Sequence, residues 1–238
     1  MKLYLSFSLI LNAILLAIIC YVFITEQNIS WQKGKIQTKF EHGSSYLNIE
    51  AWANTLSKLE INADAVFYGN SITFESCFHE FFPDKVICNM GCNGDDLDDL
   101  ANRSFLIKSV CPKKIFILGG INSLNKITLE QFKQKYQVLV DTIKYQNPKS
   151  ELYLQSLLPV NTNLIYGKQY LHCIDKIKQA NSLIKSIAKK SGCTFIDLYS
   201  KYQEHDSLPE KFTEDGLHIK PTAYSIWADH IYKYLYSP

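Results

Sequence analysis

Short apolar runs alternate with helical stretches along most of this 238-residue chain, and this alternation limits its fold more than any other feature. The runs are rich in β-branched and aromatic residues and lie at 65–69, 85–89, 114–120, 151–158 and 193–198. Helical patterns separate them, at 74–82, 95–109, 128–145 and 168–190, and a last helix follows Pro221. Strands that alternate with helices form a parallel sheet covered on both faces. We therefore predict an α/β protein, a three-layer α/β/α sandwich with about five parallel strands.

The amino-terminal segment is long and apolar, and residues 3–25 carry no charge. A membrane-spanning helix needs ~20 such residues. Lys2 precedes the segment and favours a cytoplasmic amino terminus, and no small-residue cleavage site closes the run before Glu26. We expect an N-terminal hydrophobic helix that serves as a transmembrane signal anchor over residues 1–25, with a cleaved signal peptide as the alternative. The rest of the chain would then lie outside the cytoplasm, in the periplasm or at the cell surface, or be secreted after cleavage.

The remaining chain divides into a leading part and one domain. Residues 26–61 combine a polar juxtamembrane linker with a helix whose apolar spacing runs from Tyr46 to Leu59, and residues 62–238 carry the alternating pattern. Six of the seven cysteines lie beyond the apolar segment, where disulfides and buried free thiols are both possible. The formal net charge of +2 gives no basic field for nucleic acid.

Candidate reactive groups follow several predicted strands. Open parallel sheets bind ligands beyond the carboxyl ends of their strands. The first strand runs into Gly69-Asn70-Ser71, close to a helix start whose free N–H groups suit a developing negative charge. Gly94 follows the second strand and Asn122 the third, and one side-chain amide donor can stabilise an oxyanion by ~3 kcal/mol. Each of these short motifs alone is also typical of an ordinary turn.

Two further residues complete this candidate set. Asp215 and His218 are three residues apart before the last helix, a spacing that can place a carboxylate against an imidazole and fix its tautomer.

The four aspartates at 95, 96, 98 and 99 suit the first turn of a helix and match no calcium loop, so we predict no metal site. The loop at 156–167 follows the fourth strand and is expected to line a substrate site.

Taken in order, these segments resemble the SGNH, or GDSL-type, hydrolase family over roughly residues 62–236. The resemblance rests on YGNSI, NGDD, GGINS, LLPVN and DGLHIKPTAY. Three positions depart from the usual family pattern: Asn70 replaces an aspartate, Ser123 replaces the aspartate that often follows the asparagine of the third motif, and Ala223 replaces a frequent glycine. The asparagine at 70 removes a charge beside the serine and so bears on the substrate subclass.

The resemblance implies a flavodoxin-like sheet and a serine esterase without metal or cofactor. It implies that Ser71 is the nucleophile, that His218 is its base and that Asp215 orients the imidazole. The implied oxyanion hole consists of the Ser71 and Gly94 N–H groups and the Asn122 amide. Substrate contacts are expected from Asn70, Pro159, Val160 and Asn161.

A small domain with few insertions favours an open site and a small acyl group. We therefore expect hydrolysis of O-acetyl groups on carbohydrate. The alternatives are a lipid esterase or lysophospholipase, helped by the anchor, and a glycan O-acetyltransferase that uses the same residues. The expected partners are a small-molecule or glycan ester and, through the N-terminal segment, a membrane; nucleic acid is not expected.

Overall fold

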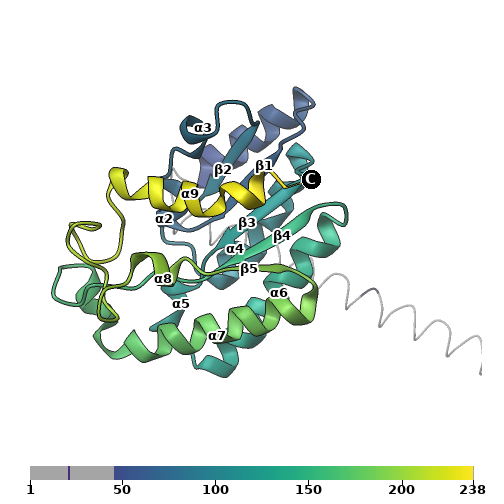
Figure 1. The fold of residues 1–238 in the computed structure, drawn as a ribbon. Coiled ribbons are helices and arrows are strands. Elements are labelled where there is room, and N and C mark those ends of the chain that lie inside the picture. The colour runs from purple at the N-terminus through teal and green to yellow at the C-terminus, as the bar shows by residue number, and fades with distance from the viewer. Residues whose placement is uncertain (1–20, 22–45, 238) are drawn as a thin grey trace, which may run out of the picture. The chain divides into compact units, whose positions relative to one another are not determined.

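The computed structural model of this chain describes Tyr21 and residues 46–237. The chain divides into two units, residues 1–41 and 42–238, and every element below belongs to the second. Its five strands are β1 (Ala65–Gly69), β2 (Ile87–Gly91), β3 (Lys114–Leu118), β4 (Glu151–Gln155) and β5 (Thr194–Ile196). They form one sheet in the order β2-β1-β3-β4-β5, and all neighbouring strands are parallel. This is the flavodoxin-like order, so the predicted fold class is confirmed (Figure 1).

Helices cover both faces of this sheet. The α-helices are α2 (Ser71–Phe74), α3 (Phe78–Phe81), α4 (Leu97–Arg103), α5 (Ile121–Leu124), α6 (Leu129–Gln146), α7 (Ile174–Ser191), α8 (Tyr199–Tyr202) and α9 (Tyr224–Leu235). Three 3₁₀ segments are η1 (Ser104–Val110), η2 (Gly167–Cys173) and η3 (Pro221–Ala223). A further helix spans residues 46–58. In Figure 1, α9 crosses one face of the sheet while α4, α6 and α7 lie on the other.

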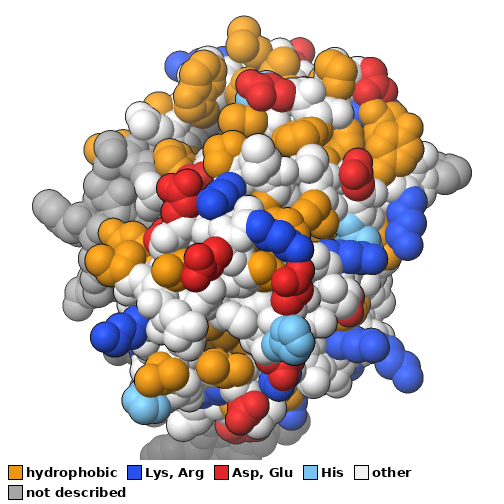
Figure 2. Space-filling view, turned by 60° about the vertical axis from the view of Figure 1, so that its left-hand side comes forward, with side chains coloured by type: hydrophobic (Ala, Val, Ile, Leu, Met, Phe, Trp, Pro, Cys, Tyr) orange, Lys and Arg blue, Asp and Glu red, His pale blue; other side chains and the backbone are white. Residues whose placement is uncertain are grey.

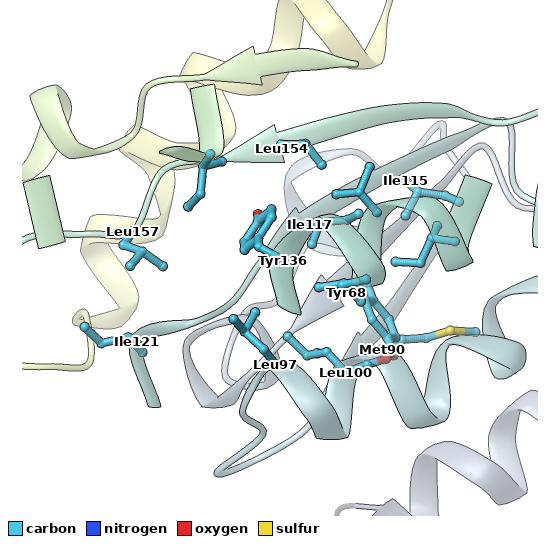
Figure 3. Packing of buried hydrophobic residues seen from close by; sticks show 14 of the residues in the cluster. Tyr68, Met90, Leu97, Leu100, Ile115, Ile117, Ile121, Tyr136, Leu154 and Leu157 are labelled. Carbon is cyan, nitrogen blue, oxygen red and sulfur yellow. Dashed lines mark hydrogen bonds between the residues drawn. The ribbon is translucent and has the colours of Figure 1, made fainter. Parts of the chain in front are cut away.

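Alternate residues of each central strand enter two separate cores. In β1, Val66 and Tyr68 pack with α4, α6, α7 and the helix at 46–58, whereas Ala65 and Phe67 pack with α3, α8 and α9. Because successive side chains of a strand point to opposite faces, both sets must be apolar. Figure 3 shows the first core, in which Tyr68 and side chains of β3 and β4 meet those of α4 and α6. This two-sided burial explains the continuous apolar runs in the sequence.

Several element boundaries differ from the sequence-based prediction. The helix predicted at 74–82 is two short helices, and α2 begins at Ser71 itself. The break has a tertiary cause: Asn89 donates from Nδ2 to the Thr73 and Ser76 carbonyls, both at 2.9 Å, and the Ser76 hydroxyl also donates to Thr73 O. Side-chain hydrogen bonds of this kind compete with helix continuation. The second strand begins two residues later than predicted, at Ile87, which places Gly91 inside the sheet.

The predictions for the amino-terminal part fall largely on residues outside the described range. The hydrophobic anchor helix and the linker before residue 46 lie there, whereas the helix at 46–58 is present and buries Tyr46, Ile49 and Ala53 in the first core. None of the helices within residue 21 and residues 46–237 has the length and apolar character needed to cross a bilayer. Disulfides and free thiols were both possible for the cysteines; the six that the structure describes are free thiols, and three of them are buried.

The visible surface carries no large patch of one charge. Figure 2 shows acidic and basic side chains interspersed over one face of the molecule. This distribution agrees with the formal net charge of +2.

Candidate active site

Ser71 lies at the carboxyl end of β1, in the first position of α2. The side chain of Asn70 caps this helix by accepting a hydrogen bond from the Ile72 N–H at 3.1 Å. The turn requires Gly69, because a Cβ atom there would lie 2.2 Å from the Leu118 carbonyl oxygen. Glycine before the turn and a capping asparagine inside it therefore fix where the serine hydroxyl is presented.

His218 connects Ser71 to Asp215. Its Nε2 lies 2.9 Å from the Ser71 Oγ, and its Nδ1 lies 2.6 Å from Asp215 Oδ2. Since an ionised carboxylate only accepts hydrogen bonds, Nδ1 donates and Nε2 is left to accept from the hydroxyl. The structure thus brings together the three residues that the sequence predicted as a reactive set, although 147 positions separate the serine from the histidine.

Hydrogen bonds to Asp215 keep its carboxylate charged. Oδ1 accepts from the backbone N–H groups of Leu217 and His218, both at 2.8 Å. Partial burial raises the pKa of Asp215, but the hydrogen bonds from the His218 ring and these two N–H groups outweigh it, so this pKa lies below its usual value. The carboxylate therefore stays ionised at neutral pH and favours the tautomer described above.

The loop after β4 supports this acidic turn. The Asp215 carbonyl accepts from Tyr166 N at 2.8 Å, and the Gly216 carbonyl accepts from Asn161 N at 2.8 Å. Gly216 has a φ of +88°, and a Cβ atom on it would lie 2.3 Å from the Asn161 carbonyl oxygen. The sequence signal was the Asp-Gly pair, which is typical of a turn with positive φ.

The residues predicted to contact substrate lie in the wall behind the site. Asn70, Pro159, Val160 and Asn161 are all buried, and none of them lines the cavity at Ser71. Asn70 is occupied in capping α2, and Asn161 donates from Nδ2 to the Leu208 carbonyl at 3.0 Å. The strand-end rule located the loop correctly, but its side chains at 159–161 turn into the protein and hold the backbone behind the site.

A cavity of about 540 Å³ opens above Ser71 and His218. Gly94 and Asn122, the residues predicted for an oxyanion hole, both line this cavity. Gly94 adopts a φ of +79°, and the Asn122 amide donates to the Asp95 carbonyl at 2.9 Å and accepts from the Tyr170 hydroxyl at 3.3 Å. An amide nitrogen carries two N–H groups, so the bond to Asp95 orients Asn122 and leaves its second N–H group available.

Among the other lining residues, Tyr166 belongs to the loop at 156–167 that was expected to line a substrate site, and the rest were not predicted. Most side chains of this lining carry polar groups, although apolar atoms make up the larger share of its surface; they are Glu75, Asn93, Asn125, Lys126, Tyr166, Gln169, Tyr170 and Leu217. The ring of Tyr166 stands edge-on to the imidazole of His218, with centroids 6.0 Å apart. Most of these residues lie in loops and short helices whose sequences carry no periodic signal, so only the structure could place them at the site.

A buried ion pair behind the cavity also escaped the sequence analysis. Asp95 and Arg103 are both fully buried and are hydrogen bonded to each other through Nε and Oδ2. The aspartate run suggested a helix start, and Asp96 and Asp99 do form a capping box for α4. The described residues contain no group of three or more His, Cys, Asp or Glu that could hold a metal ion.

The chain matches the sequence model of the GDSL-like lipase/acylhydrolase family over residues 67–226. No curated protein sequence matches it. Among solved structures, it is similar to a Streptococcus pneumonia protein provisionally assigned as a platelet activating factor, with 22% identity, a TM-score of 0.72 and coverage of 88% of this chain and 99% of that one.

Two other solved structures share the fold. A GDSL-like lipase from Bacteroides thetaiotaomicron is 21% identical, with a TM-score of 0.66 and coverage of 79% of this chain and 97% of that one. A variant of an acetyl xylan esterase from Geobacillus stearothermophilus is 18% identical, with a TM-score of 0.57 and coverage of 74% and 97%. At these identities the likeness concerns the fold.

Proposed function

Because the chain belongs to the GDSL-like lipase/acylhydrolase family, we propose that it hydrolyses carboxylic esters through an acyl-enzyme on Ser71. The observation that carries this proposal is the pair of hydrogen bonds that joins the Ser71 hydroxyl to His218 and His218 to Asp215. A hydroxyl is a weak nucleophile unless a neighbouring base removes its proton during attack. His218 is placed and oriented for that task.

The proposed reaction has two halves. The Ser71 oxygen attacks the ester carbonyl while its proton passes to His218 Nε2, and the charged imidazole is stabilised by Asp215. The negative oxygen of the tetrahedral intermediate accepts hydrogen bonds from Gly94, Asn122 and the Ser71 N–H. The alcohol leaves with the proton from His218, and water then repeats the sequence on the acyl-serine and releases the acid.

We infer that the preferred substrate is a short acyl ester, such as an O-acetyl group, on a carbohydrate. Amide groups of Asn93, Asn125 and Gln169 line the cavity and suit the hydroxyl groups of a sugar. Tyr166 is about half exposed beside His218 and offers both a ring face and a hydroxyl. The structural neighbour described as an acetyl xylan esterase is in keeping with this substrate class.

A long acyl chain finds less support. The apolar groove lined by Trp52, Leu56 and Phe74 has a volume of about 640 Å³ but shares no lining residue with the cavity at Ser71. Contact between α2 and β2 separates the two, because a Cβ atom on Gly91 would lie only 2.1 Å from Phe74 N. A lipid esterase would need an aliphatic path from the serine, whereas most side chains around the cavity end in polar groups.

Turnover of nitrophenyl esters tests the proposal. Ser71→Ala and His218→Ala should fold as the wild type does and lose turnover of nitrophenyl acetate, whereas His172→Ala, a change at an exposed histidine, should keep it. The specificity constant should fall as the acyl chain lengthens, because the apolar groove shares no lining residue with the cavity at Ser71. Activity retained by Ser71→Ala would refute the nucleophile, and a preference for long chains would refute the substrate class. An acceptor glycan in the assay separates hydrolysis from acetyl transfer.

A further inference from the structure

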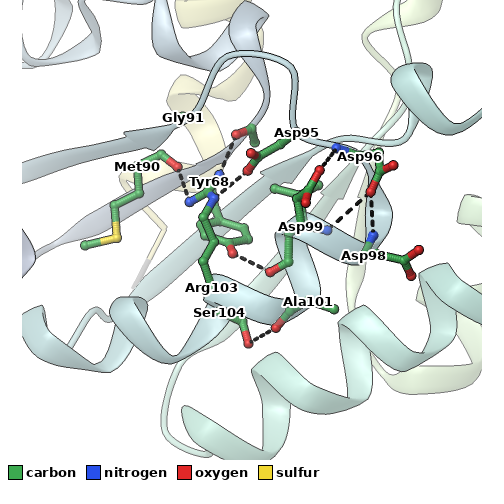
Figure 4. A network of polar contacts seen from close by, with 12 residues as sticks. Tyr68, Met90, Gly91, Asp95, Asp96, Asp98, Asp99, Ala101, Arg103 and Ser104 are labelled. Atoms are coloured by element: carbon green, nitrogen blue, oxygen red, sulfur yellow. Dashed lines mark hydrogen bonds and ion pairs between the residues drawn. The ribbon is translucent and has the colours of Figure 1, made fainter. Parts of the chain in front are cut away.

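Arg103, the last residue of α4, is buried in the wall behind the cavity. Its side chain is fully buried, and arginine is rarely so unless it is paired. The guanidinium donates from Nε to Asp95 Oδ2 and from Nη1 to the Met90 carbonyl at 2.9 Å (Figure 4). From Nη2 the guanidinium of Arg103 also donates to the Gly69 carbonyl at 2.8 Å. Its Cζ also lies 4.3 Å from the ring centroid of Tyr68. One planar cation therefore connects β1, β2 and the loop after β2.

The acceptors of Arg103 belong to the segments that present the reacting groups. Gly69 is two residues before Ser71, and Asp95 directly follows Gly94. The Gly69 carbonyl also accepts from Cys92 N at 2.9 Å, which joins the ends of the two strands. Movement of the guanidinium would thus be passed to both the serine turn and the glycine loop.

Asp95 extends this connection to Asn122. Its carboxylate accepts from Arg103 while its backbone carbonyl accepts from the Asn122 amide at 2.9 Å. Gly94 has no side chain of its own to anchor it, and its φ of +79° makes the loop conformation depend on its neighbours. Fixing Asp95 therefore fixes both Gly94 and Asn122 with respect to the cavity.

We infer that Arg103 is a positioning residue, which acts through Asp95 to hold Gly94 and Asn122 where they stabilise the oxyanion. The inference rests on the proposed function, because it concerns the same reaction. Stability alone is a weak explanation for the pair, since apolar residues of similar volume often replace a buried ion pair without loss. Oxyanion donors act through preorganisation, and a fixed charge network behind them supplies it.

Lys114 provides a matched control. It is also a buried cation, and its Nζ donates to the Tyr234 carbonyl at 2.8 Å and to the Ser237 carbonyl at 2.6 Å. It lies in the first position of β3, at the opposite end of the sheet from the cavity. Its removal should destabilise the fold without reaching the oxyanion donors.

The test compares Arg103→Met, Arg103→Lys, Asp95→Asn and Lys114→Met in nitrophenyl acetate turnover, well below each melting temperature. We expect Arg103→Met to lower kcat by about 10²-fold with KM changed by less than about threefold, as for loss of one oxyanion donor. Arg103→Lys keeps the positive charge but cannot make all three hydrogen bonds of the guanidinium, so its kcat should lie between those of Arg103→Met and the wild type. Lys114→Met should lower the melting temperature and leave kcat within about twofold of the wild type.

The outcomes separate this inference from the proposed function. If Ser71→Ala is inactive and folded Arg103→Met keeps its kcat, or loses no more than Lys114→Met, the positioning role is wrong and the esterase proposal stands. If Ser71→Ala retains turnover, the esterase proposal itself fails. Should Arg103→Met not fold, Asp95→Asn decides, because it is nearly isosteric and should lower kcat by about tenfold at unchanged KM.

Discussion

The substitution Asp215→Asn tests the proposed mechanism most directly, because it changes a proton position and little else. The asparagine carbonyl can still accept the N–H groups of Leu217 and His218 that now reach Oδ1 at 2.8 Å. Its NH₂ group then replaces Oδ2, which lies 2.6 Å from His218 Nδ1, and donates to that nitrogen. The imidazole is driven into the other tautomer, with its proton on Nε2.

In that tautomer His218 cannot accept the proton of Ser71, whose Oγ lies 2.9 Å from Nε2. We expect kcat for nitrophenyl acetate to fall by about 10⁴-fold, which is about 5.4 kcal/mol of transition-state stabilisation, as expected when a triad histidine is held in the wrong tautomer. KM should change little, because the substitution lies on the far side of the imidazole from the cavity. Steady-state kinetics and circular dichroism measure the effect and confirm the fold.

Glu214→Gln is the matched control, since it neutralises the adjacent carboxylate. The Glu214 side chain is 84% exposed and lies 3.9 Å from Lys220, a surface pair that contributes little. This variant should keep the wild-type kcat. If Asp215→Asn retained more than about a tenth of wild-type kcat, the role of Asp215 in fixing the tautomer would be wrong.

Three further predictions concern packing and pH. Gly91→Ala should lower the free energy of unfolding by about 1–3 kcal/mol, because its Cβ would lie 2.1 Å from a backbone nitrogen of α2; an unchanged urea midpoint would contradict this. Trp227→Phe removes the buried Nε1–H group that donates to Gln155 Oε1 at 2.6 Å, and it should lower the free energy of unfolding in urea by about 1–3 kcal/mol. A decrease of less than about 0.5 kcal/mol would count against this expectation. The pKa of Asp64 lies below its ordinary value of 3.8, chiefly because its carboxylate accepts a hydrogen bond from Lys113. The wild type should therefore be more stable than Asp64→Asn above pH 3.8, and this difference in the free energy of unfolding should vanish as the pH falls through the lowered pKa. Urea unfolding from about pH 7 to about pH 2 measures the difference. A difference that stays constant over this range would refute the expectation.

The sheet could be predicted from the sequence because each strand is buried on both faces. Phe67 and Tyr68 enter opposite cores, so the run has to be apolar throughout and stands out from its polar surroundings. Strand and helix ends were less predictable. The side chain of Asn89, distant in sequence, ends α2 early, and nothing in residues 71–82 alone indicates that contact.

The candidate site shows the same division. Ser71, Asp215 and His218 were found because each lies in a short motif at a strand end or before a helix, and the motifs occur in a characteristic order. The roles of Asn161 and Arg103 were missed, because position along the chain does not reveal whether a side chain turns toward the cavity or into the protein. The side chain of Asn161 turns inward to the Leu208 carbonyl, and its backbone N–H holds the Gly216 turn.

The separation of 147 positions between Ser71 and His218 has a consequence for biosynthesis. A nascent chain that has completed the first three strands already possesses the serine turn, the glycine loop and Asn122, yet it lacks any base. The base becomes available only when the final helix docks, where the Tyr224 hydroxyl donates to the Ile72 carbonyl at 2.6 Å. The proposed ester turnover should therefore begin abruptly once α9 has docked, which makes it a sharper marker of that step than helical content.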